Sequence, residues 1–216
     1  MPKHKKPRKP TQPYGYVAFA KTGHVTKHMF KLSDIKDVQE REVADKFVQQ
    51  IMTQYPDIKI NGVDSLSEAD HDFLLHTNHG KITLQVTEIP EKDYTFPISE
   101  EEYKSGRHRS ILVKKNGEIP WAVDESRRDT SIQRAIEKKL AKHYAVSTNE
   151  NLWLLIFSTS ACLTTVYYEG GKRRESMGYQ IARDYVARAT NNPFNEIWYM
   201  NLLTRAVRIW PDENNN

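Results

Sequence analysis

The chain has 216 residues and a formal net charge of +4; 38% of its residues are hydrophobic, 28% charged and 10% aromatic. This length suits one domain with a sizeable core, and the aromatic content excludes a chain that is disordered throughout. A single cysteine, Cys162, excludes an internal disulfide framework and a cysteine-based zinc site. Its apolar neighbours favour a buried small hydrophobe over a nucleophile. No apolar run approaches the roughly 20 residues that cross a bilayer, and no hydrophobic segment follows the basic N-terminus, so we expect a soluble protein of the cytoplasm.

The positive charge is concentrated in residues 1–13, which contain no acid and five basic residues: Lys3, Lys5, Lys6, Arg8 and Lys9. A charge of +5 in this tail and +4 in the whole chain leaves −1 for residues 14–216. Four prolines in the tail oppose regular structure, so we expect it to be disordered. Two interpretations remain open: an arm that binds phosphates through residues such as Lys5, Lys6, Arg8 and Lys9, or a solubilising terminus.

After the tail, the sequence predicts two paired strands and a long helix. Residues 14–20 and 25–32 have the composition of a hairpin. Ser33 is predicted to cap a helix that ends near Gln54, because the next residues are Tyr55-Pro56 and a residue before proline disfavours helical geometry.

One acidic residue of this helix lies on its apolar stripe, which is predicted to begin at Ile35. Glu40 lies three, four and seven residues before Val43, Ala44 and Phe47, whereas Glu42 does not share their face. A charged group on an inward face needs a partner or a function, so Glu40 is a candidate site residue.

Three extended runs follow the helix, at residues 58–63, 71–75 and 81–89. The turn sequence Asn78-His79-Gly80 predicts that the last two runs form a hairpin. Side chains alternate between the two faces of a strand. The polar face of the last run is expected to carry Thr83, Gln85 and Thr87.

Residues 90–128 are rich in prolines and charges, which predicts an irregular insertion or flap with one strand at 111–113. Basic side chains cluster near the middle of this segment: Arg107, His108, Arg109, Lys114 and Lys115. Two interpretations remain open, a surface that contacts nucleic acid through Arg107 and Arg109, or an ordinary charged loop.

A second helix is predicted to begin after Asp129 or Thr130 and to run to about His143. Lys139 lies within its apolar stripe, seven residues after Ile132, whereas Lys138 points elsewhere. This helix therefore also turns one charge inward.

The last third of the sequence predicts the rest of an α/β pattern. Residues 152–157 are continuously apolar, as in a central strand buried on both faces. The remaining predicted elements are a strand at 162–168, a turn at 170–171, a helix at 173–189 opened by Lys172, Arg173 and Arg174, and strands at 197–200 and 206–210.

The order helix, three strands, helix and strand over residues 34–158 resembles the core of the PD-(D/E)XK nuclease superfamily, the restriction-endonuclease-like fold. In that family an Asp starts one hairpin strand, an acid-x-Lys triplet lies on the next, and a Glu from the preceding helix often joins them. Asp72, Gln85-Val86-Thr87 and Glu40 stand at the matching positions. The resemblance implies a single α/β domain over residues 14–216, with a three-layer core in which helices flank a mixed central sheet.

The resemblance also implies hydrolysis of phosphodiester bonds in DNA or RNA, with Mg²⁺ held by Asp72, Gln85 and Glu40. Two positions depart from the family pattern. Gln85 replaces the second acid, so it offers an oxygen ligand without a charge. Thr87 replaces the lysine and cannot supply a cation. Lys139 is the expected substitute, because some family members take this lysine from the following helix.

Alternatives remain open on the sequence alone. Besides a metal-dependent nuclease, the chain fits a catalytically inactive nuclease fold that binds nucleic acid, or a protein-interaction subunit; a homodimer is expected only by family analogy. Glu40 and Lys139 could simply pair with each other, and Glu88 is a reserve ligand if a bulge turns it inward. A zinc site is a further alternative, from Asp70, His71, His76 and His79.

Overall fold

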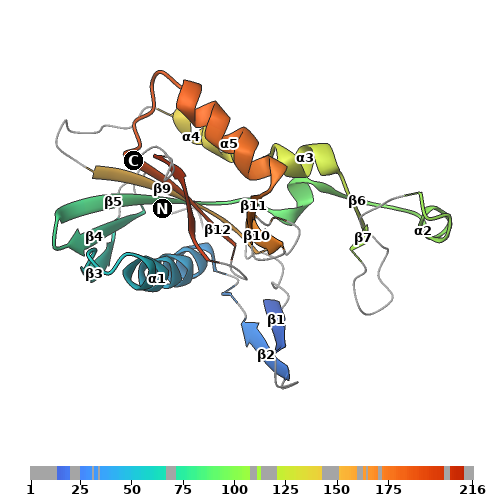
Figure 1. Cartoon of the computed structure of the whole chain (residues 1–216), viewed down its shortest axis with the longest axis horizontal. Coiled ribbons are helices and arrows are strands. Elements are labelled where there is room, and N and C mark those ends of the chain that lie inside the picture. Colours follow the sequence, from blue (N-terminus) through green and yellow to red (C-terminus); the bar gives the residue numbers. More distant parts are fainter. Residues whose placement is uncertain are drawn as a thin grey trace, which may run out of the picture.

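The computed structural model describes residues 14–19, 25–30, 32–33, 35–66, 72–107, 111–112, 121–142, 151–159, 163, 165–169, 172–201 and 205–211. These residues form an α/β protein with a six-stranded mixed sheet and several helices (Figure 1). The basic tail, residues 1–13, and Cys162 lie outside the described residues.

The six strands of the central sheet are, in spatial order, β13 (Val207–Trp210), β12 (Glu196–Asn201), β9 (Asn151–Ser158), β5 (Gly80–Glu88), β4 (Phe73–Thr77) and β3 (Ile60–Ser65). The strands β3, β4 and β5 form an antiparallel meander. Strand β9 is parallel to both of its neighbours, β5 and β12, and β13 closes the sheet antiparallel to β12. The predicted hairpin is confirmed, because Thr77 pairs with Gly80 across a two-residue turn.

Helices cover both faces of this sheet. Helix α1 (Lys36–Gln54) packs on one face, and α4 (Ser131–Leu140) and α5 (Met177–Arg188) on the other (Figure 1). The α1 side of the core is built largely from Val43, Ala44, Phe47, Ile51, Leu84, Val86, Trp153, Leu155 and Phe157. The other side is built largely from Ile132, Ile136, Ala182, Val186, Leu152, Leu154, Ile156 and Tyr199.

This two-sided core explains the unbroken apolar run of β9. Alternate β9 side chains supply the two clusters, so a strand between two helical layers has no polar face. The prediction of a central buried strand is confirmed. Strand β5 differs because its α4-facing side chains include the buried polar residues Thr83 and Gln85.

The start of α1 corrects two predictions. Ser33 does not cap the helix: its Oγ accepts a hydrogen bond from the Ile35 amide at 3.2 Å, and α1 begins only at Lys36. Ile35 is 64% exposed rather than part of the buried stripe, because it precedes the first helical turn. The predicted end at Gln54 is confirmed.

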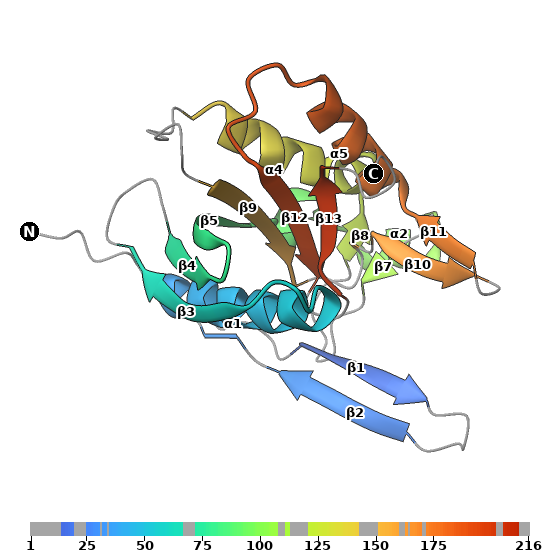
Figure 2. The same ribbon diagram turned by 60° about the vertical axis from the view of Figure 1, so that its left-hand side comes forward.

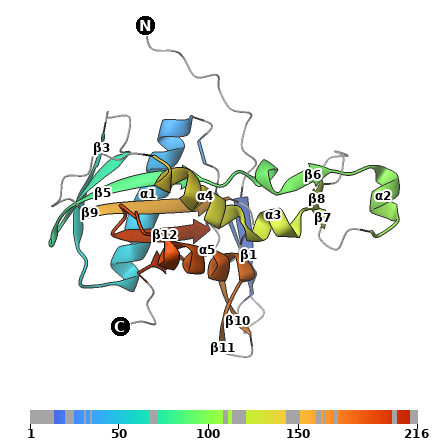
Figure 3. The ribbon, with the colours of Figure 1, turned by 90° about the horizontal axis from the view of Figure 1, so that it is seen from above.

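The described residues between 90 and 123 form an arm with regular secondary structure. The predicted strand at 111–113 is confirmed at Ile111–Leu112, whereas the prediction that it is the one strand of an irregular segment is wrong. The arm contains η1 (Glu91–Asp93), β6 (Thr95–Pro97), α2 (Glu100–Lys104), β7 (Ile111–Leu112) and β8 (Trp121–Val123). Its strands form a small antiparallel sheet in the order β6-β8-β7, and the arm extends away from the central sheet (Figure 3). Helix α3 (Glu125–Asp129) then leads back to α4.

Two separate hairpins accompany the core: β1 (Tyr14–Phe19) with β2 (Val25–Phe30), and β10 (Val166–Glu169) with β11 (Lys172–Glu175) (Figure 2). The second corrects the prediction of a helix from Arg173, because Lys172 pairs with Glu169 in a strand. Helix α5 begins only at Met177, after Ser176, whose side chain accepts a hydrogen bond from the Tyr179 amide.

The remaining boundaries differ by two or three residues. Strand β3 begins at Ile60 rather than 58, and β4 begins at Phe73, so Asp72 precedes the strand. Helix α4 ends at Leu140 rather than near 143. Thr130 holds the N-cap position of α4, but its hydroxyl donates to the Ser126 carbonyl and does not cap. Within the described residues, no helix is both long and apolar enough to cross a membrane.

Candidate functional site

The candidate site forms where β5 extends beyond its partner β4. The β4–β5 pairing starts at Phe73 and Leu84, so Gln85 to Glu88 have no β4 residue beside them. The backbone amide of Val86 is satisfied by a side chain instead, donating to Oδ2 of Asp72 at 2.7 Å. The side-chain amide of Gln85 donates to the same oxygen. Asp72 is thus fixed against β5 by two hydrogen bonds, because buried backbone donors need a partner.

Gln85 occupies a position that few polar side chains adopt. It is 4% exposed and lies on the α4-facing side of β5, opposite Leu154 of β9. A buried amide is costly unless it is hydrogen-bonded, and Asp72 provides that bond. The sequence prediction that Gln85 and Asp72 lie together agrees with this contact.

Glu40 reaches the same region from α1. It is 8% exposed, and one carboxylate oxygen lies 2.9 Å from Nζ of Lys36. Burial raises the pKa of Glu40; Lys36 opposes this shift, whereas the negative charges of Asp72 and Asp37 add to it. Glu40 is therefore a constrained carboxylate whose ionised form is disfavoured by its surroundings.

Lys36 is a member of the site that the sequence prediction missed. Burial lowers its pKa, but the hydrogen bond and charge of Glu40, and then the charge of Asp72, outweigh burial and raise it. The sequence does contain an indication of this pair, because Lys36 stands four residues before Glu40, the spacing at which helix side chains form ion pairs.

Lys139 approaches from α4 on the opposite side of the sheet. Its Nζ lies 3.5 Å from the carbonyl oxygen of Val86, the same residue whose amide is bound by Asp72. Burial lowers the pKa of Lys139 to about 8; Asp72 and Glu40 oppose this shift, and Lys142 and Lys36 add to it. The inward orientation predicted for Lys139 is confirmed, whereas its neighbour Lys138 is exposed.

The structure therefore brings Glu40, Asp72, Gln85 and Lys139 together around one stretch of β5. The charge of Asp72 contributes to the pKa shifts of both Glu40 and Lys139, although the residues come from α1, the segment before β4, and α4. Gln85 of β5 contacts Asp72 directly. The alternative pairing of Glu40 with Lys139 is not observed; the ion pair of Glu40 is with Lys36.

Glu88 does not reach this site. Strand β5 pairs with β9 without a register shift from Ile82 to Glu88, so no bulge turns Glu88 toward Gln85. Glu88 instead lines a small separate pocket with Asp93 and Arg134. Thr87 is half-buried and lines the same pocket.

The other predicted binding residues lie elsewhere. Arg107 is exposed after α2 on the arm, while Lys5, Lys6, Arg8, Lys9 and Arg109 lie outside the described residues.

The alternative zinc site is not assembled in the described part of the chain. Nε2 of His76 lies 2.7 Å from Oδ2 of Asp64, and His79 contacts Asn78 and the Asp57 carbonyl. Asp70 and His71 lie outside the described residues. No group of three or more His, Cys, Asp or Glu within the described ranges could hold a metal ion. The amide oxygen of Gln85 is a ligand of a different kind from these four residue types.

Comparisons of the chain with models of protein families, with curated proteins and with solved structures found no match. A functional assignment therefore rests on the geometry of the site.

Proposed function

We propose that the chain is a metal-dependent nuclease with a restriction-endonuclease-like core, hydrolysing phosphodiester bonds of DNA or RNA. The element order supports this fold: α1 is followed by the meander of β3, β4 and β5, then by α4 and by β9 parallel to β5. Insertions such as the arm at 90–123 interrupt this order without changing it.

The observation that carries the proposal is the convergence of side chains at β5. Asp72 and Gln85 are hydrogen-bonded, and Glu40 and Lys139 reach the same place from opposite sides of the sheet. These residues lie far apart in sequence, and two of them are charged groups placed in a largely buried environment. Such placement costs stability, so it favours a functional role.

The donor set fits a divalent cation such as Mg²⁺. The carboxylates of Asp72 and Glu40 and the amide oxygen of Gln85 are hard oxygen ligands. Gln85 now turns its nitrogen toward Asp72, but a half-turn of the amide exchanges nitrogen and oxygen. When bound, Mg²⁺ would activate water for attack and offset negative charge on the phosphate.

The charge balance implies that metal binding is weak. Lys36 and Lys139 carry two positive charges beside the two carboxylates, so the site lacks the net negative charge that favours a divalent cation. We therefore expect cleavage to need a high concentration of Mg²⁺, or Mn²⁺ in its place.

Lys139 can supply the cation that Thr87 cannot. With a pKa of about 8, Nζ of Lys139 is mostly protonated at pH 7. It can stabilise negative charge that develops on the phosphate, and it releases a proton more readily than a surface lysine does. Lys36 has a different role, holding the Glu40 carboxylate at 2.9 Å.

A second candidate function is binding of nucleic acid without catalysis. It is favoured by the hydrogen bond from the Gln85 amide to Asp72, which occupies an oxygen that a metal would use. In this interpretation, the two carboxylates and the two lysines form a structural network in which opposite charges balance. The attraction to phosphates then comes from the basic tail.

Incubating the purified chain with plasmid, linear and single-stranded DNA and with RNA tests both functions. The nuclease proposal expects cleavage with Mg²⁺ or Mn²⁺ that EDTA stops and added metal restores. Absence of cleavage in every metal and substrate contradicts it. Salt-sensitive binding without cleavage, lost when residues 1–13 are deleted, supports the second candidate instead.

Gln85→Glu is expected to strengthen metal dependence. A second carboxylate beside Asp72 removes the hydrogen bond donor and adds repulsion, so the metal-free protein should lose roughly 1–3 kcal/mol of stability. The same charge should lower the metal concentration needed for cleavage. Thermal unfolding in EDTA and a Mn²⁺ titration of cleavage measure the two effects. The control is Asn191→Asp, the same amide-to-carboxylate change at an exposed turn residue, and an identical metal response in both variants contradicts Gln85 as a ligand.

A further inference from the structure

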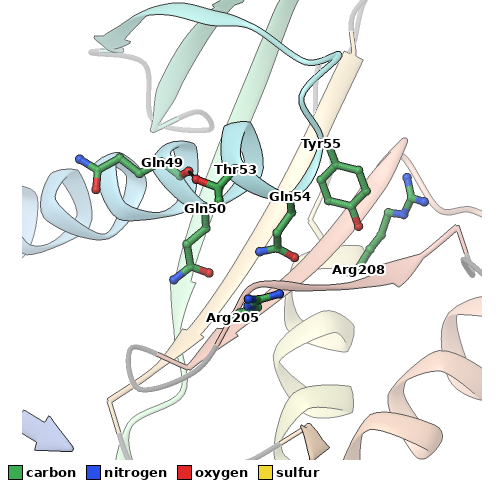
Figure 4. A pocket seen from close by; sticks show the side chains of 7 residues that line it. All are labelled: Gln49, Gln50, Thr53, Gln54, Tyr55, Arg205 and Arg208. Atoms are coloured by element: carbon green, nitrogen blue, oxygen red, sulfur yellow. Dashed lines mark hydrogen bonds between the residues drawn. The ribbon is translucent and has the colours of Figure 1, made fainter. Parts of the chain in front are cut away.

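A large polar pocket lies where the C-terminal half of α1 meets β13 and the residues before it, away from the candidate site. It is broadly open to solvent and has a volume of about 870 Å³, within the range of small-ligand sites. Its described lining consists of Gln49, Gln50, Thr53, Gln54, Tyr55, Arg205 and Arg208 (Figure 4).

The walls of this pocket are held in place by specific contacts. Oε1 of Gln50 accepts a hydrogen bond from the Ala206 amide, which ties α1 to the segment before β13. The guanidinium of Arg208 lies 5.7 Å from the centre of the Tyr55 ring and 5.6 Å from that of Trp198. Its Nη1 also lies 3.7 Å from Glu196, so Arg208 is fixed before any ligand arrives.

Two further groups are available to a ligand. Arg205 is exposed at the pocket. Nε2 of Gln54 is buried and has no hydrogen-bond partner within the described residues, and its side chain extends from α1 toward Arg205 (Figure 4). A buried donor without a partner is costly, so an acceptor group on a ligand would be favoured there.

The composition of the lining indicates the chemistry of the ligand. Two arginines line the pocket and none of the described lining residues is acidic, so the pocket favours an anion. Guanidinium groups match phosphate geometry. The glutamine amides and the Thr53 hydroxyl offer both donors and acceptors, and a side-chain amide can form two hydrogen bonds to one edge of an adenine base. An inorganic anion such as phosphate would use the hydrogen-bond donors of the pocket but not its acceptors.

We propose that this pocket binds a nucleotide, with the phosphate at Arg205 and Arg208 and the base at Gln54 and the neighbouring amides. The inference does not depend on the nuclease proposal. Gln54 follows Glu40 by 14 residues on α1, so the pocket lies about 20 Å along the helix from the candidate site.

Calorimetric titration at low salt with the four nucleoside monophosphates, the nucleosides and inorganic phosphate tests this site. We expect at least one monophosphate to bind more tightly than its nucleoside and than phosphate. Arg205→Ala should weaken that binding about tenfold or more, because a charge-assisted hydrogen bond is lost. Arg188→Ala, an exposed arginine on α5, should leave it unchanged.

Two further variants test whether the nucleotide binds in this pocket rather than at the candidate site, and whether Gln54 contacts it. Asp72→Asn should retain the binding, which excludes occupancy of the candidate site. Gln54→Leu removes the unpartnered donor and should weaken nucleotide more than phosphate. The proposal is overturned if no monophosphate binds, if phosphate binds as tightly as the nucleotides, or if Arg205→Ala and Gln54→Leu both leave the affinity unchanged.

Discussion

Asp72→Asn is expected to reduce metal-dependent cleavage by on the order of 100-fold or more while the fold remains intact. Asparagine keeps a side-chain oxygen that can accept from the Val86 amide, but it removes the negative charge at the centre of the site. Loss of a residue that merely orients a metal ligand already costs about 10- to 100-fold in affinity or activity, so loss of a charged ligand should cost more. Initial cleavage rates over a range of Mn²⁺ concentrations measure the effect.

The control for this prediction is Asp184→Asn, which removes an exposed carboxylate from α5. Both variants should show the circular dichroism and unfolding temperature of a folded chain. Cleavage that persists unchanged in folded Asp72→Asn would mean that the activity arises elsewhere, and the nuclease proposal at this site would be wrong.

The position of the site was predictable because it depends on local periodicity. The inward positions of Glu40 and Lys139 could be predicted because apolar residues recur at the 3.6-residue spacing in both helices. Both side chains are turned inward as expected. Asp72 faces Gln85 because a two-residue turn at Asn78-His79 fixes the register of the hairpin. The contact between Asp72 and Gln85 could therefore be predicted by counting residues outward from the turn.

Strands β6 and β8 of the arm, and strand β11, were not predictable by the same means. Strand β6 pairs with β8, which lies more than 20 residues further along the chain. Both strands are too short to show the alternation of apolar and polar residues that predicts a strand. Strand β11 reads Lys-Arg-Arg-Glu, residues with good helix propensity of which Lys and Glu are depleted in strands. Pairing with β10 decides its conformation, as tertiary context overrides local propensity.

Lys36 was missed for a different reason. Its i,i+4 spacing to Glu40 is visible in the sequence, but such pairs are common on exposed helix faces and contribute little there. Only the burial of Glu40, and the nearness of Asp72 and Lys139, give Lys36 a place in the site. These are properties of the packed chain.

Lys139→Met is expected to lower cleavage by about 100- to 1000-fold, the usual effect of removing a group that stabilises charge in the transition state. Methionine keeps most of the buried volume of the side chain but removes the cation beside Asp72. In the wild type, the rate should fall as the pH rises through about 8, since Lys139 then loses its proton. The pH dependence of the cleavage rate measures this, and Lys138→Met, an exposed neighbour on α4, is the matched control.

The same substitution is expected to stabilise the fold near pH 7. Because burial lowers the folded-state pKa of Lys139 to about 8, the unfolded chain binds more protons between about pH 8 and 10.5. The wild type therefore carries a full penalty below pH 8 that disappears as the pH rises to 10.5. Lys139→Met should gain about 1–3 kcal/mol at pH 7 and progressively less above pH 8, measured by denaturant unfolding at several pH values. Reduced activity together with increased stability would show that Lys139 serves the function although its buried charge destabilises the fold. Reduced activity with reduced stability would instead make Lys139 a structural residue.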